Sequence, residues 1–157
     1  YYQDGQVRDN IEGGKGLILS TWGVYSGDIV NGSREGSGKQ FGTYVDDDKS
    51  YTLTEGQWSG NKANGQCTYT DRNLADESKT QVIKGNVKDN MFDGDLTITQ
   101  KNGDGQEDTF SAHADNGTYS LIRNDNGEYV YMESSSGWYY YYDNEEGLKN
   151  HGVWAGY

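Results

Sequence analysis

The sequence predicts an all-β protein in which tandem antiparallel hairpins form one elongated, twisted sheet. Three observations support this prediction: a recurring glycine pattern, a composition rich in glycine and aromatic residues, and the absence of helical periodicity. The 157 residues include 23 glycines, 14 tyrosines and no proline, which suits uninterrupted hydrogen-bond ladders. No window places apolar residues at the i, i+3, i+4 and i+7 spacing of an amphipathic helix. This length fits one domain, residues 1–157.

The pattern G-x-[VIW]-x-x-[NG]-x-x-x-G occurs four times. Its first glycines are Gly5, Gly27, Gly56 and Gly85, and its second glycines are Gly14, Gly36, Gly65 and Gly94. The Asn or Gly between them suits a turn, because both residue types tolerate positive φ. Side chains alternate in polarity on both sides of this position. Each unit is therefore expected to be a strand, a turn of several residues and a second strand.

The strands of these units follow in order along the chain. The first strands pass through Gln3, Tyr25, Thr54 and Ile83, and the second strands cover residues 15–19, 37–41, 66–70 and 95–99. Glycine within a strand costs conformational entropy, so it needs a reason. We expect large rings of neighbouring strands to lie over these bare backbone positions.

The segment Gly56–Gly65, with Trp58 as its third residue, resembles the MORN repeat. The second unit keeps the aromatic residue that often precedes the motif, as Tyr25. The resemblance covers residues 1–99 and implies four MORN-like hairpin repeats laid side by side in a twisted antiparallel sheet. It also implies a non-catalytic role in assembly or partner binding.

Beyond residue 99 the glycine pattern changes, and residues 100–157 are expected to form a divergent, tyrosine-rich meander of hairpins. A polar loop is expected at 101–108, strands at 118–123, 128–133 and 138–142, and turns at 124–127 and 134–137. The segment Gly152–Gly156 repeats the pattern of Gly23–Gly27, and we expect it to be the first strand of a further unit.

Charge and cysteine content exclude several classes of protein. The chain has 25 acidic and 13 basic residues, a net charge of −12, which disfavours nucleic acid and anionic membrane surfaces. Its longest apolar run is far shorter than the roughly 18 residues that membrane insertion needs. Cys67 is the single cysteine, so neither an intramolecular disulfide nor a cysteine-based zinc site can form.

Aromatic residues are the candidate binding groups. The segment Trp138–Tyr140 is similar to choline-binding or glucan-binding cell-wall repeats, which implies a cation–π cage or stacking on sugar rings. The candidate aromatic surface consists of Tyr25, Trp58, Trp138, Tyr140 and Trp154. The alternative is that the same rings cover the sheet as part of a core.

The sequence predicts neither an enzyme nor a metal or cofactor site. The acidic clusters Asp46–Asp48, Asp104–Asp108 and Asp143–Glu146 lack the spacing of a calcium-binding loop and suit solvated turns. His113 and His151 lack the spacing of a zinc enzyme, and Cys67 suits a small buried hydrophobe. A carboxylate pair for glycoside hydrolysis stays open, because 25 acidic residues always offer a pair at suitable separation.

We therefore expect a non-enzymatic repeat scaffold that binds another protein or a second copy of itself, at the bacterial cell envelope. The alternative is a module that binds choline or cell-wall carbohydrate through exposed tryptophan and tyrosine. The chain begins with Tyr1 rather than Met, which indicates that a leader or tag was removed. With the acidity and the scarcity of cysteine, this start favours a secreted or cell-surface location.

Overall fold

The computed structural model describes residues 1–21, 23–44, 47–73, 80–101, 107–123, 130–133 and 138–141. These residues form strands and turns, without a helix among them. In chain order the strands are β1 (Tyr2–Gln3), β2 (Gln6–Val7), β3 (Gly13–Ser20), β4 (Gly23–Val30), β5 (Ser33–Tyr44), β6 (Asp47–Ser59), β7 (Lys62–Asn73), β8 (Thr80–Lys88), β9 (Met91–Lys101), β10 (Glu107–Asp115), β11 (Thr118–Arg123), β12 (Val130–Glu133) and β13 (Trp138–Tyr141).

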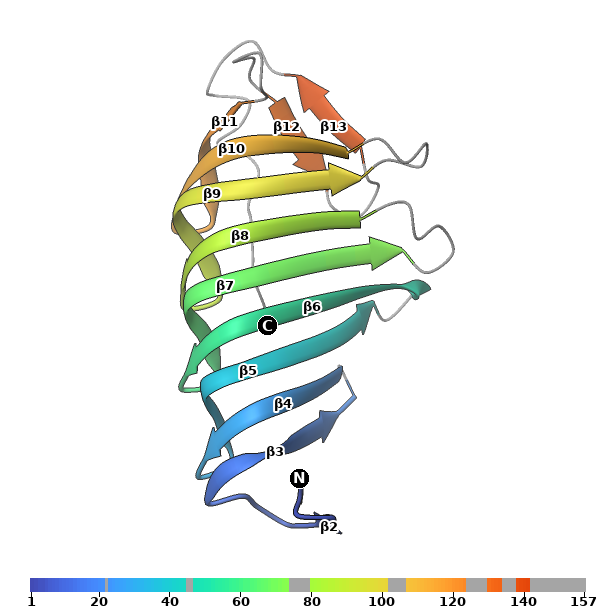
Figure 1. The fold of residues 1–157 in the computed structure, drawn as a ribbon, viewed down its shortest axis with the longest axis vertical. Coiled ribbons are helices and arrows are strands. Elements are labelled where there is room, and N and C mark those ends of the chain that lie inside the picture. Colours follow the sequence, from blue (N-terminus) through green and yellow to red (C-terminus); the bar gives the residue numbers. More distant parts are fainter. Residues whose placement is uncertain are drawn as a thin grey trace.

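Eleven of these strands form one open antiparallel sheet, a single layer that winds along the long axis of the molecule (Figure 1). The order is β11-β10-β9-β8-β7-β6-β5-β4-β3-β1-β2, so from β3 to β11 each strand pairs with its neighbours in the chain. β12 and β13 pair with each other in a separate two-stranded sheet. The predicted all-β array of consecutive hairpins is confirmed.

Three of the first glycines of the repeat lie in one row across the sheet. The pairing places Gly16, Gly27, Gly38, Gly56, Cys67, Gly85, Leu96 and Ala112 side by side. A Cβ added at Gly38 would lie 2.5 Å from Cε2 of Tyr25, so the ring of this tyrosine rests on bare backbone of the next strand. At Gly85 a Cβ would collide with the aliphatic side chain of Leu96 and not with an aromatic ring.

The turns that join β1 to β2, β4 to β5, β6 to β7, β8 to β9 and β10 to β11 contain two residues each, and both residues have positive φ. They are Asp4-Gly5, Asn31-Gly32, Gly60-Asn61, Asp89-Asn90 and Asn116-Gly117. Two left-handed residues are the mark of the type I′ turn, whose twist matches that of the strands. The prediction of turns of several residues is therefore wrong. Gly5 lies in one of these turns with φ +78°, so it is not equivalent to Gly27 within a strand.

The second glycines of three units lie in β-bulges. In the β4–β5 hairpin Asp28 alone faces Glu35–Ser37, and the β6–β7 and β8–β9 hairpins contain the same irregularity. The central residues of the bulges are Gly36, Gly65 and Gly94, with φ of +59°, +107° and +105°. Extra residues on one strand bend it, and Figure 1 shows the strands curling toward their turns.

The hairpin array continues past residue 99, where the glycine pattern ends. Ala112 of β10 pairs with Leu96 and takes the place of a first glycine in the row. The β10–β11 hairpin shifts register by one residue only, between His113 and Ala114, where the earlier hairpins shift by two. The predicted strands at 118–123, 128–133 and 138–142 correspond to β11, β12 and β13. The predicted turns at 124–127 and 134–137 and the segment 152–156 lie outside the described residues.

The core lies on one side of the sheet, which we call the inner face. Its buried apolar side chains are Ile11, Tyr25, Ile29, Trp58, Ala63, Cys67, Ile83, Val87, Phe92, Leu96, Ile98, Ala112 and Ala114. Successive residues of a strand point to opposite faces, so their neighbours lie on the outer face. In β6, for example, half-buried Leu53 lies between Thr52 and Thr54, which are buried on the inner face.

Candidate interaction surface

Tyr25 and Trp58 lie in the core, where they are 0% and 3% exposed. Their rings meet edge to face, with centroids 5.4 Å apart and planes at 79°. The Tyr25 hydroxyl donates to the backbone oxygens of Asp28 (2.9 Å) and Glu35 (3.2 Å). Nε1 of Trp58 donates to the backbone oxygen of Gly38 at 3.1 Å. Their polar atoms are thus bonded within the protein, and neither ring is open to a ligand.

The other predicted aromatic residues are not placed by the structure in a common surface with these two. Trp138 and Tyr140 belong to β13, whose side chains are not described, and Trp154 lies outside the described residues. The environment of Tyr25 is that of a structural residue. Burial raises its pKa to about 12, and the negative charge of Asp28 acts in the same direction.

Arg34 is a buried cation beside Trp58. It is 6% exposed, and its guanidinium carbon lies 4.7 Å from the centroid of the indole ring. Nη1 donates to Oε1 of Gln40 at 3.0 Å, and Nη2 donates to the backbone oxygen of Asn61. Burial lowers the pKa of this guanidinium. The glycine pattern does not predict this cluster, because the positions of Arg34 and Gln40 are occupied by other residue types in the other units.

Asparagine side chains connect successive hairpin turns. Oδ1 of Asn61 accepts from the backbone nitrogen of Arg34 at 2.9 Å, and Oδ1 of Asn90 accepts from that of Ala63 at 2.8 Å. The backbone nitrogens of both asparagines donate back to the same residues. The Asn position of the repeat, which suits positive φ, therefore also joins one unit to the next.

An apolar row crosses the outer face of six strands, β3–β8. Its apolar members are Leu19, Val24, Phe41, Leu53 and Val82, and Thr70 is its residue on β7. Together with Tyr51, which lies in the adjacent row two residues before Leu53, these five apolar residues form what we call the outer apolar stripe. Leu19 is 59% exposed and Phe41 is 39% exposed. The rings of Phe41 and Tyr51 contact each other with centroids 5.2 Å apart. The single-layer fold thus leaves an apolar band with its side chains half-buried or exposed.

Basic side chains border this stripe on both sides. Lys39 and Lys84 lie in the row nearer the turns, and Arg72 and Lys101 lie in the row at the far side, which also contains Tyr51. Nη1 of Arg72 donates to the Tyr51 hydroxyl at 3.4 Å. Nζ of Lys39 is 3.2 Å from Oε1 of Glu55. This arrangement of cations could not be predicted from the sequence, because only the strand register brings these lysines and Arg72 to the same surface.

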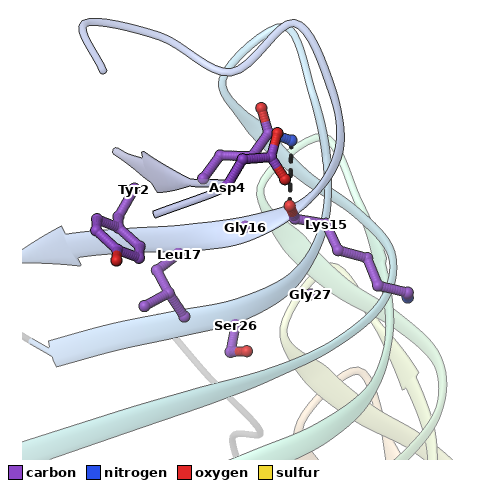
Figure 2. Close-up of a pocket in the computed structure, with 8 residues that line it drawn as sticks. Tyr2, Asp4, Lys15, Gly16, Leu17, Ser26 and Gly27 are labelled. Carbon is purple, nitrogen blue, oxygen red and sulfur yellow. Dashed lines mark hydrogen bonds between the residues drawn. The ribbon is translucent and has the colours of Figure 1, made fainter. Parts of the chain in front are cut away.

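A shallow hollow of about 310 Å³ lies on the outer face beside β1. Tyr2 and Lys15 lie at opposite ends of it, above a floor that includes Gly16 and Gly27 (Figure 2). Nε2 of Gln3 donates to the backbone oxygen of Lys15 at 3.1 Å, and Nζ of Lys15 lies 2.8 Å from a carboxylate oxygen of Asp28. This volume is at the lower end for ligand pockets, and its ammonium group already has a carboxylate partner.

Two further titratable groups of the described residues have shifted pKa values. Nδ1 of His113 lies 2.8 Å from Asp95, and this hydrogen bond raises the pKa of the exposed imidazole. Burial raises the pKa of the Cys67 thiol, whose sulfur packs in the core. Within the described ranges, no group of three or more His, Cys, Asp or Glu side chains is arranged to hold a metal ion.

The acidic clusters at 46–48, 104–108 and 143–146 are not described in full. The part of the chain that the structure describes has no helix able to cross a membrane.

Comparison with protein families agrees with the hairpin architecture. Residues 25–50 and 55–74 match the family model of the MORN repeat. The first match covers most of β4 and β5, and the second covers the end of β6 and β7. No curated protein matches the chain. Residues 25–50 and 55–74 of this chain are therefore MORN repeats.

Proposed function

We propose that this chain is a non-catalytic scaffold that binds another protein through the outer apolar stripe. The observation that carries the proposal is that six apolar side chains cross the outer face without being buried. Contiguous exposed apolar surface in a folded protein commonly marks an interaction site. MORN repeats generally act as interaction modules and are typically non-catalytic, which supports the same interpretation.

The centre of the stripe has the composition of a binding hot spot. Phe41 and Tyr51 contact each other there, next to the aliphatic side chain of Leu53. Aromatic anchors held on a rigid element lose little conformational entropy on binding and commonly dominate interface energies. Strands β5 and β6 hold these rings, and each of the two strands pairs with a neighbour on both sides.

The setting that we propose is the bacterial cell envelope, with the chain secreted or at the cell surface. The net charge of −12 and the single cysteine support an extracellular setting. Fractionation of the native host tests this part of the proposal. We expect the protein in the envelope or culture medium, and its recovery in the cytosol would contradict the proposed location.

A comparative pull-down from the native host tests the scaffold function. Phe41→Lys places a charge in the outer apolar stripe, and Ser59→Lys is the matched control, since Ser59 is exposed on the outer face at the turn end of β6, away from the stripe. We expect a host protein that binds the wild type and the control but is recovered about tenfold less with Phe41→Lys. Circular dichroism verifies that both variants are folded. The function is rejected when no host protein distinguishes the two variants.

A further inference from the structure

The outer face differs in charge from the chain as a whole, which has a net charge of −12. The described charged side chains in the rows that border or continue the outer apolar stripe are Lys39, Glu55, Arg72, Lys84, Lys101 and Glu107. Four of these side chains are cations and two are carboxylates. This part of an acidic protein is therefore locally basic.

The spacing of these cations fits the width of a helix. The row that contains Lys84 and the row that contains Lys101 are separated by four residues along β8, from Lys84 to Thr80, which pairs with Lys101. At about 3.3 Å per residue the two rows are about 13 Å apart, close to the roughly 10–12 Å diameter of an α-helix with its side chains.

The length of the stripe gives a second dimension. Its six strands, β3–β8, lie side by side, and at about 4.8 Å between strands they span about 24 Å. A helix of about 16 residues has this length. A surface of this shape, with the row of Phe41 and Leu53 along its middle and cations in the row on each side, is complementary to a helix with an apolar face and acidic flanks.

We propose that the outer apolar stripe binds an acidic amphipathic helix of a partner protein. The inference rests on the proposed function and names the chemistry of the partner. Apolar side chains of the helix pack on Phe41, Tyr51 and Leu53. Carboxylates on its two flanks contact Lys84 and Lys39 on one side, where Lys39 exchanges its exposed contact with Glu55, and contact Arg72 and Lys101 on the other.

Two other occupants fit the charges less well. A second copy that packed outer face to outer face would bring the same basic rows together, and like charges oppose such contact. An anionic membrane attracts basic rows, but the net charge of −12 repels the same membrane. The acidic helix is therefore the occupant that the charges of this face favour, and the other two are outcomes of the test.

Binding of a synthetic peptide to the full chain tests the inference. The probe is a labelled 16-residue helical peptide with a leucine and phenylalanine face and glutamate flanks, and its counterpart has lysine flanks. Lys84→Glu reverses a charge beside the stripe. Lys88→Glu is the matched control, because Lys88 is an exposed lysine of the same strand beside the turn. The two variants have equal net charge.

We expect the acidic peptide to bind and the basic peptide not to bind in fluorescence anisotropy. Lys84→Glu should weaken binding about fivefold, while Lys88→Glu leaves it within about twofold. Added salt should weaken binding to the wild type, since the flanking pairs are exposed. Circular dichroism of both variants verifies that they are folded.

Three results would overturn the inference: no binding of the acidic peptide, equal effects of the two variants, or binding only to vesicles of phosphatidylserine and phosphatidylcholine. A dimer in analytical ultracentrifugation that Phe41→Lys dissociates would assign the stripe to a second copy instead. A host protein whose capture requires Phe41 but not Lys84 would reject the acidic helix and leave the scaffold function intact. If the acidic peptide does not bind and no host protein requires Phe41 for capture, the outer apolar stripe is not an interaction surface.

Discussion

Gly38 shows what a single glycine does in this sheet. Its bare Cα receives the ring of Tyr25 from the neighbouring strand, and that ring packs on Trp58. The tyrosine hydroxyl then bonds to two backbone oxygens in the same hairpin. One missing side chain therefore makes room for the aromatic centre of the inner face, and that centre cannot serve as an exposed binding surface.

Substitution at Gly38 tests this packing. Gly38→Ala should lower the free energy of unfolding by about 2 kcal/mol, because the new Cβ collides with the Tyr25 ring. Gly13→Ala is the control, since no atom lies within 4 Å of a Cβ there, and it should change stability by less than about 0.5 kcal/mol. Urea unfolding measures both. Equal effects of the two substitutions would show that the ring does not rest on the backbone at Gly38.

Tyr25 also predicts a pH dependence of stability. Its pKa is about 12 in the folded chain and near 10 in an unfolded chain, so folding favours the neutral phenol. The contribution of this group is complete below pH 10 and is lost as the pH rises from 10 to 12, because the unfolded chain releases its proton first. Tyr25→Phe has no such proton.

The difference in unfolding free energy between the wild type and Tyr25→Phe should therefore shrink between pH 8 and pH 12. At pH 8 the wild type should be more stable by about 1 kcal/mol, through the hydrogen bonds of the hydroxyl. Urea unfolding across this pH range gives the comparison. A difference that stays constant would mean that the hydroxyl is exposed to solvent in the folded chain.

At the scale of the hairpin, the sequence predicts the strands better than the turns. Polarity that alternates with period two locates the strands around Tyr25, Thr54 and Ile83. The predicted turn length is wrong because the prediction ends the turn at the second glycine of the motif, whereas Gly36 has positive φ in a bulge. A turn and a bulge both require left-handed backbone, so glycine alone does not distinguish them.

The asparagine bridges between turns make a prediction about how hairpins are joined. Asn90→Gly keeps the left-handed backbone but leaves the nitrogen of buried Ala63 without the side-chain acceptor. We expect a loss of about 1–2 kcal/mol in the free energy of unfolding. Asn31→Gly, at an exposed turn residue that also has positive φ, should change stability by less than about 0.5 kcal/mol. A similar loss in both variants would mean that conformation, and not the bridge, makes asparagine useful.

At the scale of the molecule, the array is longer than the glycine pattern indicates. Ala112 takes the place of a first glycine in the β10–β11 hairpin, so the row continues although the motif is lost. A small residue satisfies the packing requirement there. Strict glycine spacing therefore does not follow the row of hairpins beyond residue 99.

The outer apolar stripe was missed for a related reason. Thr70 lies in the same row between Leu53 and Val82, so no single segment of sequence is apolar enough to indicate a surface. Only the register of many strands assembles the stripe and the cations beside it. The candidate site is a property of the whole sheet, whereas the repeat is a property of each hairpin.

The single-layer sheet has one covered face and one open face. Thiol reactivity tests this difference directly, because Cys67 is the only cysteine and lies on the inner face. In the native wild type, Cys67 should react with a water-soluble thiol reagent at least about 100-fold more slowly than in the unfolded chain. In the double variant Cys67→Ala, Thr97→Cys, the new thiol on the outer face should react nearly as fast in the folded chain as in the unfolded chain. Equal protection of both thiols would contradict the account, because the outer face would then be covered and closed to a partner.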